Sequence, residues 1–310
     1  AGGYFKRVIE STADVGQDGR MSTTSTSLTV TPRAGHLGAD VAGIDLRTPL
    51  DPASVAELLA LLDQHLVLFF RGQHLDDQQQ IAFALAFGEP YTHPIGRANG
   101  ASGPPRCEHI VDDAEHPPYQ DKWHTDVSWD FTPPTYGTLR AIDLPSRGGD
   151  TMWTNQYAVY ESLSAPMRDL LDGLTCINTA RNYGDPANRA VHPAVRVHPV
   201  TGRKCLYVNG QFSERFVELS FEESTNLLDF LRAYATHPRF SVRYRWTQGA
   251  LAMWDNRCTQ HSVLNDFEGR RVIQRVTILG DLPEGGPKRW EEYPRPAQMS
   301  SAGAKNLFDR

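Results

Sequence analysis

The stretch Trp123-His-Thr-Asp-Val-Ser-Trp129 alternates two kinds of side chain, with His124, Asp126 and Ser128 as the polar set. An alternation with period two predicts a strand whose two faces differ. On such a strand His124 and Asp126 share one face, close enough to hold one ion. A His-x-Asp pair is also typical of a plain surface hydrogen bond. The choice between these interpretations depends on the rest of the chain.

Strand patterns dominate the chain on both sides of this stretch. A buried strand is predicted at Leu66–Phe70 and a hairpin at His198–Lys204. Further β-like runs are predicted at 136–142, 149–154, 194–198, 205–209, 240–246, 250–255 and 271–279. Helices are predicted from Pro52, from Asp76 to before Gly88, and over 155–172 and 220–235. Many strands, few helices and no βαβ rhythm predict a mainly β fold with flanking helices, either a β-sandwich or a jelly roll.

Composition excludes several classes of protein. Hydrophobic residues make up 40% of the 310 residues and charged residues 22%, which allows a buried core and excludes wholesale disorder. The formal net charge of −6 argues against a nucleic-acid binder, which needs a basic surface. No apolar run reaches the roughly 18 residues of a membrane-spanning helix. The four cysteines lack CxxC spacing, which argues against zinc ribbons and dense disulfide frameworks.

The chain divides into three regions of different character. Residues 1–27 lack apolar periodicity and are predicted to form a disordered leader, in which Met21 is a candidate start and 1–20 a non-native extension. Residues 28–282 show no linker or repeat and are predicted to form a single domain. Residues 283–310 are rich in Gly, Pro and charge, which predicts a loose C-terminal tail. The N-terminus lacks a basic segment followed by an apolar one, which predicts a cytoplasmic protein.

A second histidine follows another apolar strand. His261 ends the stretch Trp254-Asp-Asn-Arg-Cys-Thr-Gln-His261, just after the apolar run Ala250–Trp254. With His124 and Asp126 it makes a set of two histidines and one carboxylate, which in non-haem Fe(II) oxygenases leaves positions open for substrate and dioxygen. Zinc accepts the same ligand types in hydrolases, so this set leaves both chemistries open.

The strand after His261 carries two arginines on one face. Arg271 and Arg275 lie four residues apart in the run 271–279, which separates them by about 13 Å along a strand. A solvated outward pair is one interpretation. If they face inward near a metal, each guanidinium needs an anion, because an unpaired buried charge is costly. Two anions beside one iron favour an acidic cosubstrate and an acidic substrate, a pattern that a zinc hydrolase does not require.

Several motifs in a fixed order resemble the TauD/TfdA family of Fe(II)/2-oxoglutarate-dependent oxygenases, and its taurine dioxygenases in particular. The motifs are Leu37-Gly-Ala-Asp-Val-Ala-Gly-Ile-Asp-Leu46, Trp123-His-Thr-Asp-Val127, Leu144-Pro-Ser-Arg-Gly-Gly-Asp-Thr151, Trp254-Asp-Asn-Arg-Cys-Thr-Gln-His261 and the segment 270–281. The resemblance covers most of the chain and implies that 28–282 is a catalytic domain with a double-stranded β-helix, a cupin-like jelly roll.

The resemblance also implies the residues that bind Fe(II) and 2-oxoglutarate. His124, Asp126 and His261 match the iron ligands of the family. Thr151 and Arg271 match the groups that hold the distal carboxylate of 2-oxoglutarate, for which a bidentate guanidinium is well suited. Dioxygen is the second cosubstrate that this family uses.

A second group of residues matches the substrate site of taurine enzymes. Arg275 and His93 match the pair that grips the substrate sulfonate, together with the backbone at Val127. Phe212 matches an aromatic wall of the pocket, and Gln120 stands where taurine enzymes have an asparagine near the amine end.

Three departures from the taurine enzymes concern the substrate. Gly96 stands where they carry a tyrosine, Gln120 replaces the asparagine, and the segment 178–192 is shorter. The space left by Gly96 favours a bulkier substrate tail. These changes leave the predicted iron and 2-oxoglutarate residues intact and make the identity of the substrate the open question.

The sequence therefore predicts an Fe(II)/2-oxoglutarate-dependent dioxygenase that hydroxylates a small anionic substrate. The first candidate is a sulfonate such as taurine, which would yield sulfite and an aldehyde. Alkyl sulfates, aryloxyalkanoates or a biosynthetic intermediate are alternatives on the same scaffold. A zinc hydrolase and a metal-binding jelly roll without turnover are the alternatives from other classes. A homo-oligomer is expected, without nucleic-acid or membrane partners.

Overall fold

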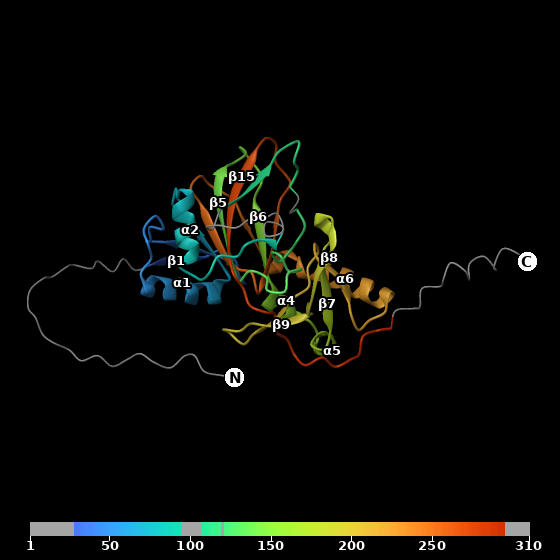
Figure 1. Cartoon of the computed structure of the whole chain (residues 1–310). Helices are drawn as coiled ribbons and strands as arrows, with labels where there is room; N and C mark the ends of the chain where they lie inside the picture. The colour runs from blue at the N-terminus through green and yellow to red at the C-terminus, as the bar shows by residue number, and fades with distance from the viewer. Residues whose placement is uncertain (1–27, 95–106, 119–120, 295–310) are drawn as a thin grey trace, which may run out of the picture.

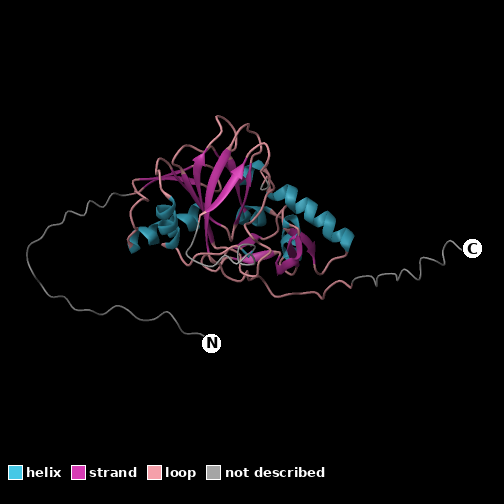
Figure 2. Ribbon diagram, turned by 45° about the horizontal axis from the view of Figure 1, so that its top comes forward, coloured by secondary structure: helices cyan, strands magenta, loops and turns pink. Residues whose placement is uncertain are grey.

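The computed structural model describes residues 28–94, 107–118 and 121–294. Strands form the centre of the molecule, and helices lie on both sides of them (Figures 1 and 2). The leader predicted over 1–27 and the predicted site residue Gln120 lie outside the described residues. Among the described helices, none is long and apolar enough to cross a membrane.

One large sheet has seven strands in the order β1-β2-β3-β13-β5-β15-β4. All neighbours in it are antiparallel except the pair β2 and β3. Its strands are β1 (Thr29–Pro32), β2 (Ala39–Ala42), β3 (Val67–Phe70), β4 (Glu108–Asp112), β5 (Tyr136–Asp143), β13 (Leu251–Asp255) and β15 (Arg271–Ile278).

Two three-stranded sheets and a hairpin complete the β structure. The order β12-β6-β14 forms one sheet and β11-β7-β8 the other, and β9 pairs with β10. Their strands are β6 (Thr151–Asn155), β7 (Thr175–Ala180), β8 (Asp185–Pro193), β9 (Val195–Val197), β10 (Lys204–Leu206), β11 (Ser213–Phe216), β12 (Ser241–Tyr244) and β14 (Thr259–Val263). The predicted hairpin at 198–204 is confirmed as the connection between β9 and β10.

Local sequence signals account for the helix boundaries. Asp51 accepts a hydrogen bond from the backbone N–H of Ser54 at 2.8 Å and begins the first helix, which has Pro52 in its first turn. Asp76 and Gln79 form a capping box that begins the second helix. The described helices are α1 (Pro52–His65), α2 (Asp77–Leu85), α4 (Gln156–Ser162), α5 (Ala165–Leu171) and α6 (Phe221–Ala235), with short 3-10 helices η1 (Arg181–Tyr183) and η2 (Pro238–Phe240).

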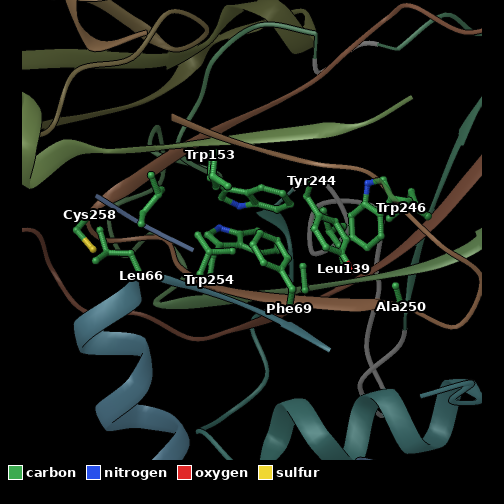
Figure 3. Packing of buried hydrophobic residues seen from close by; sticks show 14 of the residues in the cluster. Leu66, Phe69, Leu139, Trp153, Tyr244, Trp246, Ala250, Trp254 and Cys258 are labelled. Atoms are coloured by element: carbon green, nitrogen blue, oxygen red, sulfur yellow. The ribbon is translucent and has the colours of Figure 1, made fainter. Parts of the chain in front are cut away.

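The main core lies between the large sheet and the sheet β12-β6-β14. Phe69 and Trp254 of the large sheet pack against Trp153 and Tyr244 of the small one, and all four side chains are buried (Figure 3). Phe69 and Tyr244 are stacked with ring centroids 4.0 Å apart. Two facing sheets with a buried aromatic core confirm the predicted jelly roll.

The opposite face of the large sheet is covered by α1 and α2. Leu58 and Leu62 of α1 and Phe83 of α2 join one buried cluster with Leu68 and Met253 of the sheet. The large sheet is therefore buried on both faces, which explains why the predicted strand Leu66–Phe70 is a continuous apolar run and not an alternating one. Helices α4, α5 and α6 pack in a separate cluster with β7 and the β9–β10 hairpin.

Gly137 in the middle of β5 has no room for a side chain. A Cβ atom there would lie 2.2 Å from Cζ2 of Trp254, which is fully buried. We expect Gly137→Ala to lower the free energy of unfolding by about 1–3 kcal/mol, because the core must shift to admit the methyl group. Denaturant unfolding measures the change. Gly35→Ala, at a position with nothing within 4 Å, is the control and should lie close to wild type.

Three sequence predictions differ from the structure. The predicted strand 123–129 is wrong, because only His124 makes an isolated bridge and a turn follows it. The predicted helix 155–172 is two helices, separated at Leu163–Ser164 just before a second helix with Pro166 in its first turn.

The predicted loose tail does not describe residues 284–293, the part of it whose contacts the structure gives. The backbone of Gly285 bridges to Arg196, Arg289 pairs with Asp169 at 2.9 Å, and the Tyr293 N–H donates to the carbonyl of Val217. These contacts hold the segment 284–293 against the rest of the molecule. Its composition, rich in Gly, Pro and charged residues, gave no sign of this.

Candidate active site

Two predicted site histidines are brought together by their own backbones. The N–H of His124 donates to the carbonyl of His261 at 3.0 Å, and the N–H of His261 donates to the carbonyl of His124 at 2.8 Å. The two imidazole centroids lie 4.2 Å apart. His261 lies on β14, a strand that the sequence reasoning did not predict, opposite Trp153 of β6. Residues far apart in the chain therefore meet through a single antiparallel bridge.

Asp126 joins them through a turn rather than a strand. Its backbone N–H donates to Oδ1 of Asn256 at 2.9 Å, and Nδ2 of Asn256 donates back to the Asp126 carbonyl at 3.1 Å. The next residue, Val127, has φ +52, a left-handed conformation that a β-branched residue rarely adopts. Such a conformation costs of order 1–3 kcal/mol and persists only where the surroundings impose it. The clamp by Asn256 and the turn closed by Asp130 N–H to Val127 O at 2.9 Å provide that constraint.

The ligand atoms of His124, Asp126 and His261 converge in a buried cluster. They all lie within 4.8 Å of one another, with Asp126 Oδ1 3.6 Å from His124 Nε2 and 3.9 Å from His261 Nε2. His124 Nδ1 lies 2.7 Å from the carbonyl of Lys122 and donates to it, so its Nε2 presents a lone pair. Within the described residues, His124 Nε2 and Asp126 Oδ2 are buried without a hydrogen-bond partner. Buried lone pairs aimed at one point fit a metal ion.

Burial and neighbouring charge set the protonation of this cluster. Burial, followed by the neighbouring His124, lowers the pKa of His261 to about 3, so its imidazole is neutral at physiological pH. Burial raises the pKa of Asp126, but the adjacent Arg275 and the two histidines outweigh it and hold that pKa well below its usual range. Neutral imidazoles and an ionised carboxylate are the forms that bind a divalent metal.

The aromatic core fixes one of these ligands. The His261 ring lies 4.9 Å from the Trp254 ring and 6.2 Å from the Trp153 ring, centroid to centroid. Figure 3 shows the two tryptophans side by side in the middle of the core. Because both indoles are fully buried, the His261 side chain packs against rings whose positions are fixed by the core.

The predicted inward orientation of Arg271 and Arg275 is confirmed, since both are buried on β15. Arg271 Nη1 donates to Asp112 at 2.8 Å, its Nε donates to the Gly149 carbonyl at 2.9 Å, and its Nη2 lies 3.3 Å from Oγ1 of Thr151. Thr151 is on β6, so this contact joins the two sheets of the jelly roll. Burial lowers the pKa of Arg271, and Asp112 offsets this only in part.

Arg275 contacts the metal-ligand cluster itself. Its Nη1 donates to Asp126 Oδ1 at 2.7 Å, and its Nε and Nη2 donate to Glu108 Oε2 at 2.9 and 2.7 Å. The expectation that each buried arginine needs an anion from outside the protein is therefore wrong. Protein carboxylates neutralise both guanidinium groups in this structure.

Glu108 and Asp112 are site residues that the sequence reasoning missed. Both lie on β4, which pairs with β15 so that Asp112 stands opposite Arg271 and Glu108 opposite Arg275. The signal was present, because two acids four residues apart match two arginines four residues apart on an antiparallel neighbour. It was not found because no strand was predicted at 108–112.

A pocket of about 380 Å³ lies beside this arrangement. Thr151, Arg271 and Asp112 line its polar part, and His261 connects it to the metal-ligand cluster. The apolar part of its lining consists of Ile110, Val111, Pro117, Leu139, Val263 and Ile273. This lining suits a short carbon chain that ends in an anion.

The remaining predicted residues, His93 and Phe212, belong to a group of aromatic rings that reaches the cluster at His124. The Phe212 ring lies 6.1 Å from the His124 ring, and the His93 ring lies 5.6 Å from the Trp129 ring. Burial, followed by the charge of Arg275, lowers the pKa of His93. Tyr183 was not predicted, although it stacks on Phe212 at 5.8 Å and contributes to the pocket lining. Its position in the segment 178–192, which the sequence predicts to be shorter than in taurine enzymes, was the available signal.

A second buried group of possible ligands consists of His198, Asp255 and Cys258. His198 Nδ1 accepts from the backbone of Val200 and Thr201, and its Nε2 lies 3.0 Å from Asp255. Both imidazole nitrogens are therefore occupied. Arg257 forms an ion pair with Asp255 at 2.6 Å, with further bonds to both carboxylate oxygens. This group is a closed hydrogen-bond network that stabilises the start of the β13–β14 turn.

Comparison with known proteins agrees with this geometry. Residues 29–277 match the family model described as Taurine catabolism dioxygenase TauD, TfdA family. The chain is 38% identical over 281 residues to an alpha-ketoglutarate-dependent sulfate ester dioxygenase of Pseudomonas putida, covering 83% of this chain and 91% of the relative. It is 34% identical over 275 residues to an alkylsulfatase of Acinetobacter baylyi, covering 81% of this chain and 84% of the relative.

A solved structure with the same fold is the crystal structure of a taurine dioxygenase from Burkholderia xenovorans. It superposes with a TM-score of 0.75 at 38% identity, over 87% of this chain and 97% of that one. The family match covers most of the chain, and these relatives are covered over most of their own length. The chain therefore belongs to the TauD/TfdA family of Fe(II)- and 2-oxoglutarate-dependent dioxygenases.

Proposed function

We propose that this dioxygenase oxidises the carbon next to a sulfur oxyanion in a small alkyl substrate, a sulfate ester or a sulfonate. The observation that carries the proposal is the convergence of His124, Asp126 and His261, with buried lone pairs, between the Arg271 pocket and the buried Arg275. Each of these guanidinium groups keeps N–H donors beyond those that bond its protein carboxylates, which supports two anionic ligands, the cosubstrate and the substrate.

In this proposal His124 Nε2, Asp126 and His261 Nε2 hold Fe(II). The iron would supply the activation of dioxygen and the oxidation of a C–H bond. Three protein ligands leave the remaining positions for 2-oxoglutarate and dioxygen. The protein groups orient these ligands, since the Lys122 carbonyl fixes the His124 tautomer and Trp254 fixes the His261 ring.

We assign the pocket of about 380 Å³ to 2-oxoglutarate. Arg271 and Thr151 would hold its distal carboxylate, and Leu139, Val263 and Ile273 would enclose its two methylene groups. The Trp246 Nε1–H donates to Thr151 Oγ1 at 2.9 Å, which leaves the threonine hydroxyl hydrogen to donate to an anion. The keto-acid end would then face His261 and the metal.

Arg275 and His93 would orient the substrate anion, with Phe212, Tyr183 and Trp129 forming apolar walls around the alkyl part. Arg275 already bonds Asp126 at 2.7 Å, so an anion on its remaining N–H groups would place the adjacent carbon close to the metal. This geometry supports oxidation at the carbon that bears the sulfur group. The backbone at Val127 is a further predicted contact of the same anion.

The reaction balances for both substrate types. One oxygen atom of O₂ enters succinate as 2-oxoglutarate loses CO₂, and the other hydroxylates the substrate carbon. The hydroxylated carbon of a sulfate ester expels sulfate, that of a sulfonate expels sulfite, and each leaves an aldehyde. The sequence lacks the tyrosine and asparagine of taurine enzymes at Gly96 and Gln120. Together with the names of the sulfate-ester relatives, this supports alkyl sulfates over taurine.

A matched panel tests the substrate. We expect wild type to form succinate with hexyl sulfate and to release sulfate. Turnover should be lower with hexane-1-sulfonate, in which no oxygen separates the carbon from the sulfur, and with taurine, which also carries an amine. The measurement is succinate, sulfate and sulfite per chain under Fe(II), 2-oxoglutarate and air. Sulfite release from taurine as the dominant reaction would reverse the order proposed here. Absence of sulfate and sulfite from every substrate would refute the sulfur-oxyanion proposal.

Arg275 offers an independent test of the substrate site. Arg275→Gln should reduce succinate formation with the preferred sulfur substrate at least about tenfold, because loss of a buried charged partner costs roughly 2–5 kcal/mol. Decarboxylation of 2-oxoglutarate without substrate should change much less. Bound Fe(II) must be measured in parallel, since Arg275 also contacts Asp126. Equal loss of both reactions at full iron occupancy would assign Arg275 to the cosubstrate or the fold.

Other predictions from the sequence remain predictions. They are the cytoplasmic location, the homo-oligomer, the non-native extension 1–20 and the single catalytic domain over 28–282.

A further inference from the structure

Asp112 forms a buried ion pair at the far end of the cosubstrate pocket. Its carboxylate lies 2.8 Å from Arg271 Nη1, and Asp112 and Arg271 are 4% and 3% exposed. The two residues are direct cross-strand partners, because β4 and β15 pair in the register Arg271↔Asp112. The ion pair is therefore set by the register of the sheet.

Arg271 retains donors for a ligand while this pair is intact. Its Nε donates to Gly149, one N–H of Nη1 to Asp112 and one N–H of Nη2 to Thr151. Each Nη atom carries two N–H groups, so one on Nη1 and one on Nη2 remain beyond these contacts. A carboxylate can accept both as a fork without displacing Asp112. Two carboxylates would then share a single guanidinium.

The charges around this point do not supply a second cation for the ligand. Asp150, the next acid near Arg271, is paired with Arg243 at 2.6 Å. Two histidines of the lining face protein groups, since His116 Nδ1 lies 3.1 Å from Asp113 Oδ1 and His109 Nε2 lies 2.8 Å from Gln274 Nε2. Among the described residues that line the pocket, Arg271 is the one arginine and there is no lysine, and Asp112 already pairs with Arg271.

We propose that Asp112 is a specificity-determining residue of the cosubstrate pocket, which weakens the binding of any ligand with a distal carboxylate by neutralising Arg271. The inference rests on the proposed assignment of this pocket to 2-oxoglutarate. Burial raises the pKa of Asp112 despite the adjacent guanidinium, which agrees with a poorly solvated carboxylate. Such a carboxylate would repel the carboxylate of a ligand that binds beside it.

This role makes a definite prediction about charge. Asp112→Asn keeps an oxygen acceptor for Arg271 Nη1 and removes the negative charge, so the guanidinium keeps its position. We expect 2-oxoglutarate to bind about tenfold more tightly, because two carboxylates within a few ångströms repel each other appreciably inside a protein. An analogue with a distal amide, 2-oxoglutaramate, carries no distal charge and should change less than about twofold.

The test is calorimetric titration of the Mn(II)-loaded protein with 2-oxoglutarate and with 2-oxoglutaramate, without oxygen. Asp113→Asn is the matched control, because it removes the same charge one residue along, from a half-buried side chain that pairs with His116. It should leave both affinities near wild type. Asp112→Leu is the second variant, since it removes the charge together with the hydrogen bond and should also tighten 2-oxoglutarate.

The outcomes separate this inference from the function on which it rests. If Asp112→Asn leaves the affinity for 2-oxoglutarate unchanged, or if Asp112→Asn and Asp112→Leu both weaken it, Asp112 positions Arg271 and the proposal is overturned. If Arg271→Gln leaves the affinity for 2-oxoglutarate unchanged, the pocket assignment itself fails. A loss in Arg271→Gln with no gain in Asp112→Asn rejects only the role of Asp112.

Discussion

His261→Ala is expected to abolish Fe(II)-dependent turnover of 2-oxoglutarate. Substitution of a residue behind a metal ligand typically costs about 10- to 100-fold in affinity or activity, so loss of one of three ligands should exceed that. His261 is the cleanest of the three to remove, because Asp126 also pairs with Arg275 and His124 also bonds the Lys122 carbonyl. The measurements are bound Mn(II) per chain by calorimetry and succinate formed with Fe(II).

His198→Ala is the control for this experiment. It removes a buried imidazole from the other group of possible ligands, the one closed by hydrogen bonds to Asp255 and to backbone N–H groups. This variant should unfold at lower temperature but still bind one metal ion per chain. Full turnover in His261→Ala would show that His261 is no ligand. If His198→Ala is folded but has lost its metal, the metal site lies in the group of His198, Asp255 and Cys258 and the assignment to His261 is wrong.

Arg271→Ala is expected to weaken binding of 2-oxoglutarate by roughly 30- to several thousand-fold. The physical reason is that a lost charged partner in a desolvated site costs about 2–5 kcal/mol. The substitution also leaves Asp112 buried without its cation, which destabilises the fold by a further few kcal/mol. Arg271→Ala combined with Asp112→Asn removes that second effect and reports the loss of the anion site alone.

Titration with 2-oxoglutarate under anaerobic conditions measures this prediction. Arg270→Ala is the control, because Arg270 is the adjacent residue, is exposed and lies 3.4 Å from Asp143. It should bind 2-oxoglutarate as wild type does. An unchanged dissociation constant in the combined variant would mean that the distal carboxylate binds elsewhere.

Local sequence signals predicted much of the framework. The helix starts at Asp51 and Asp76 were correct, because a cap depends on residues within one turn of the helix. The strand at Leu66–Phe70 was correct, because a run buried on both faces is apolar throughout. The number of strands and the absence of a βαβ rhythm predicted a β-sandwich or a jelly roll, and the family resemblance favoured the jelly roll.

Alternation failed where tertiary contacts override it. The polar pattern around His124 and Asp126 suggested a strand, yet Asn256 holds this segment in a turn and Val127 in a left-handed conformation. His124 and Asp126 nevertheless meet, because a turn can bring alternate residues together as a strand does. The correct residues were therefore found with an incorrect local structure.

The sequence determined the chemistry through the order of its motifs, which resembles the family and indicates iron and 2-oxoglutarate, whereas two histidines and an aspartate alone also fit zinc. Only the tertiary structure decided what neutralises those arginines. Cross-strand pairing between β4 and β15 places Asp112 and Glu108 against them, over more than 150 residues of sequence separation. Periodicity shows which residues share a face of one strand or helix. Which charge neutralises a buried arginine depends on the neighbouring strand, and the register between two strands is set by the whole sheet.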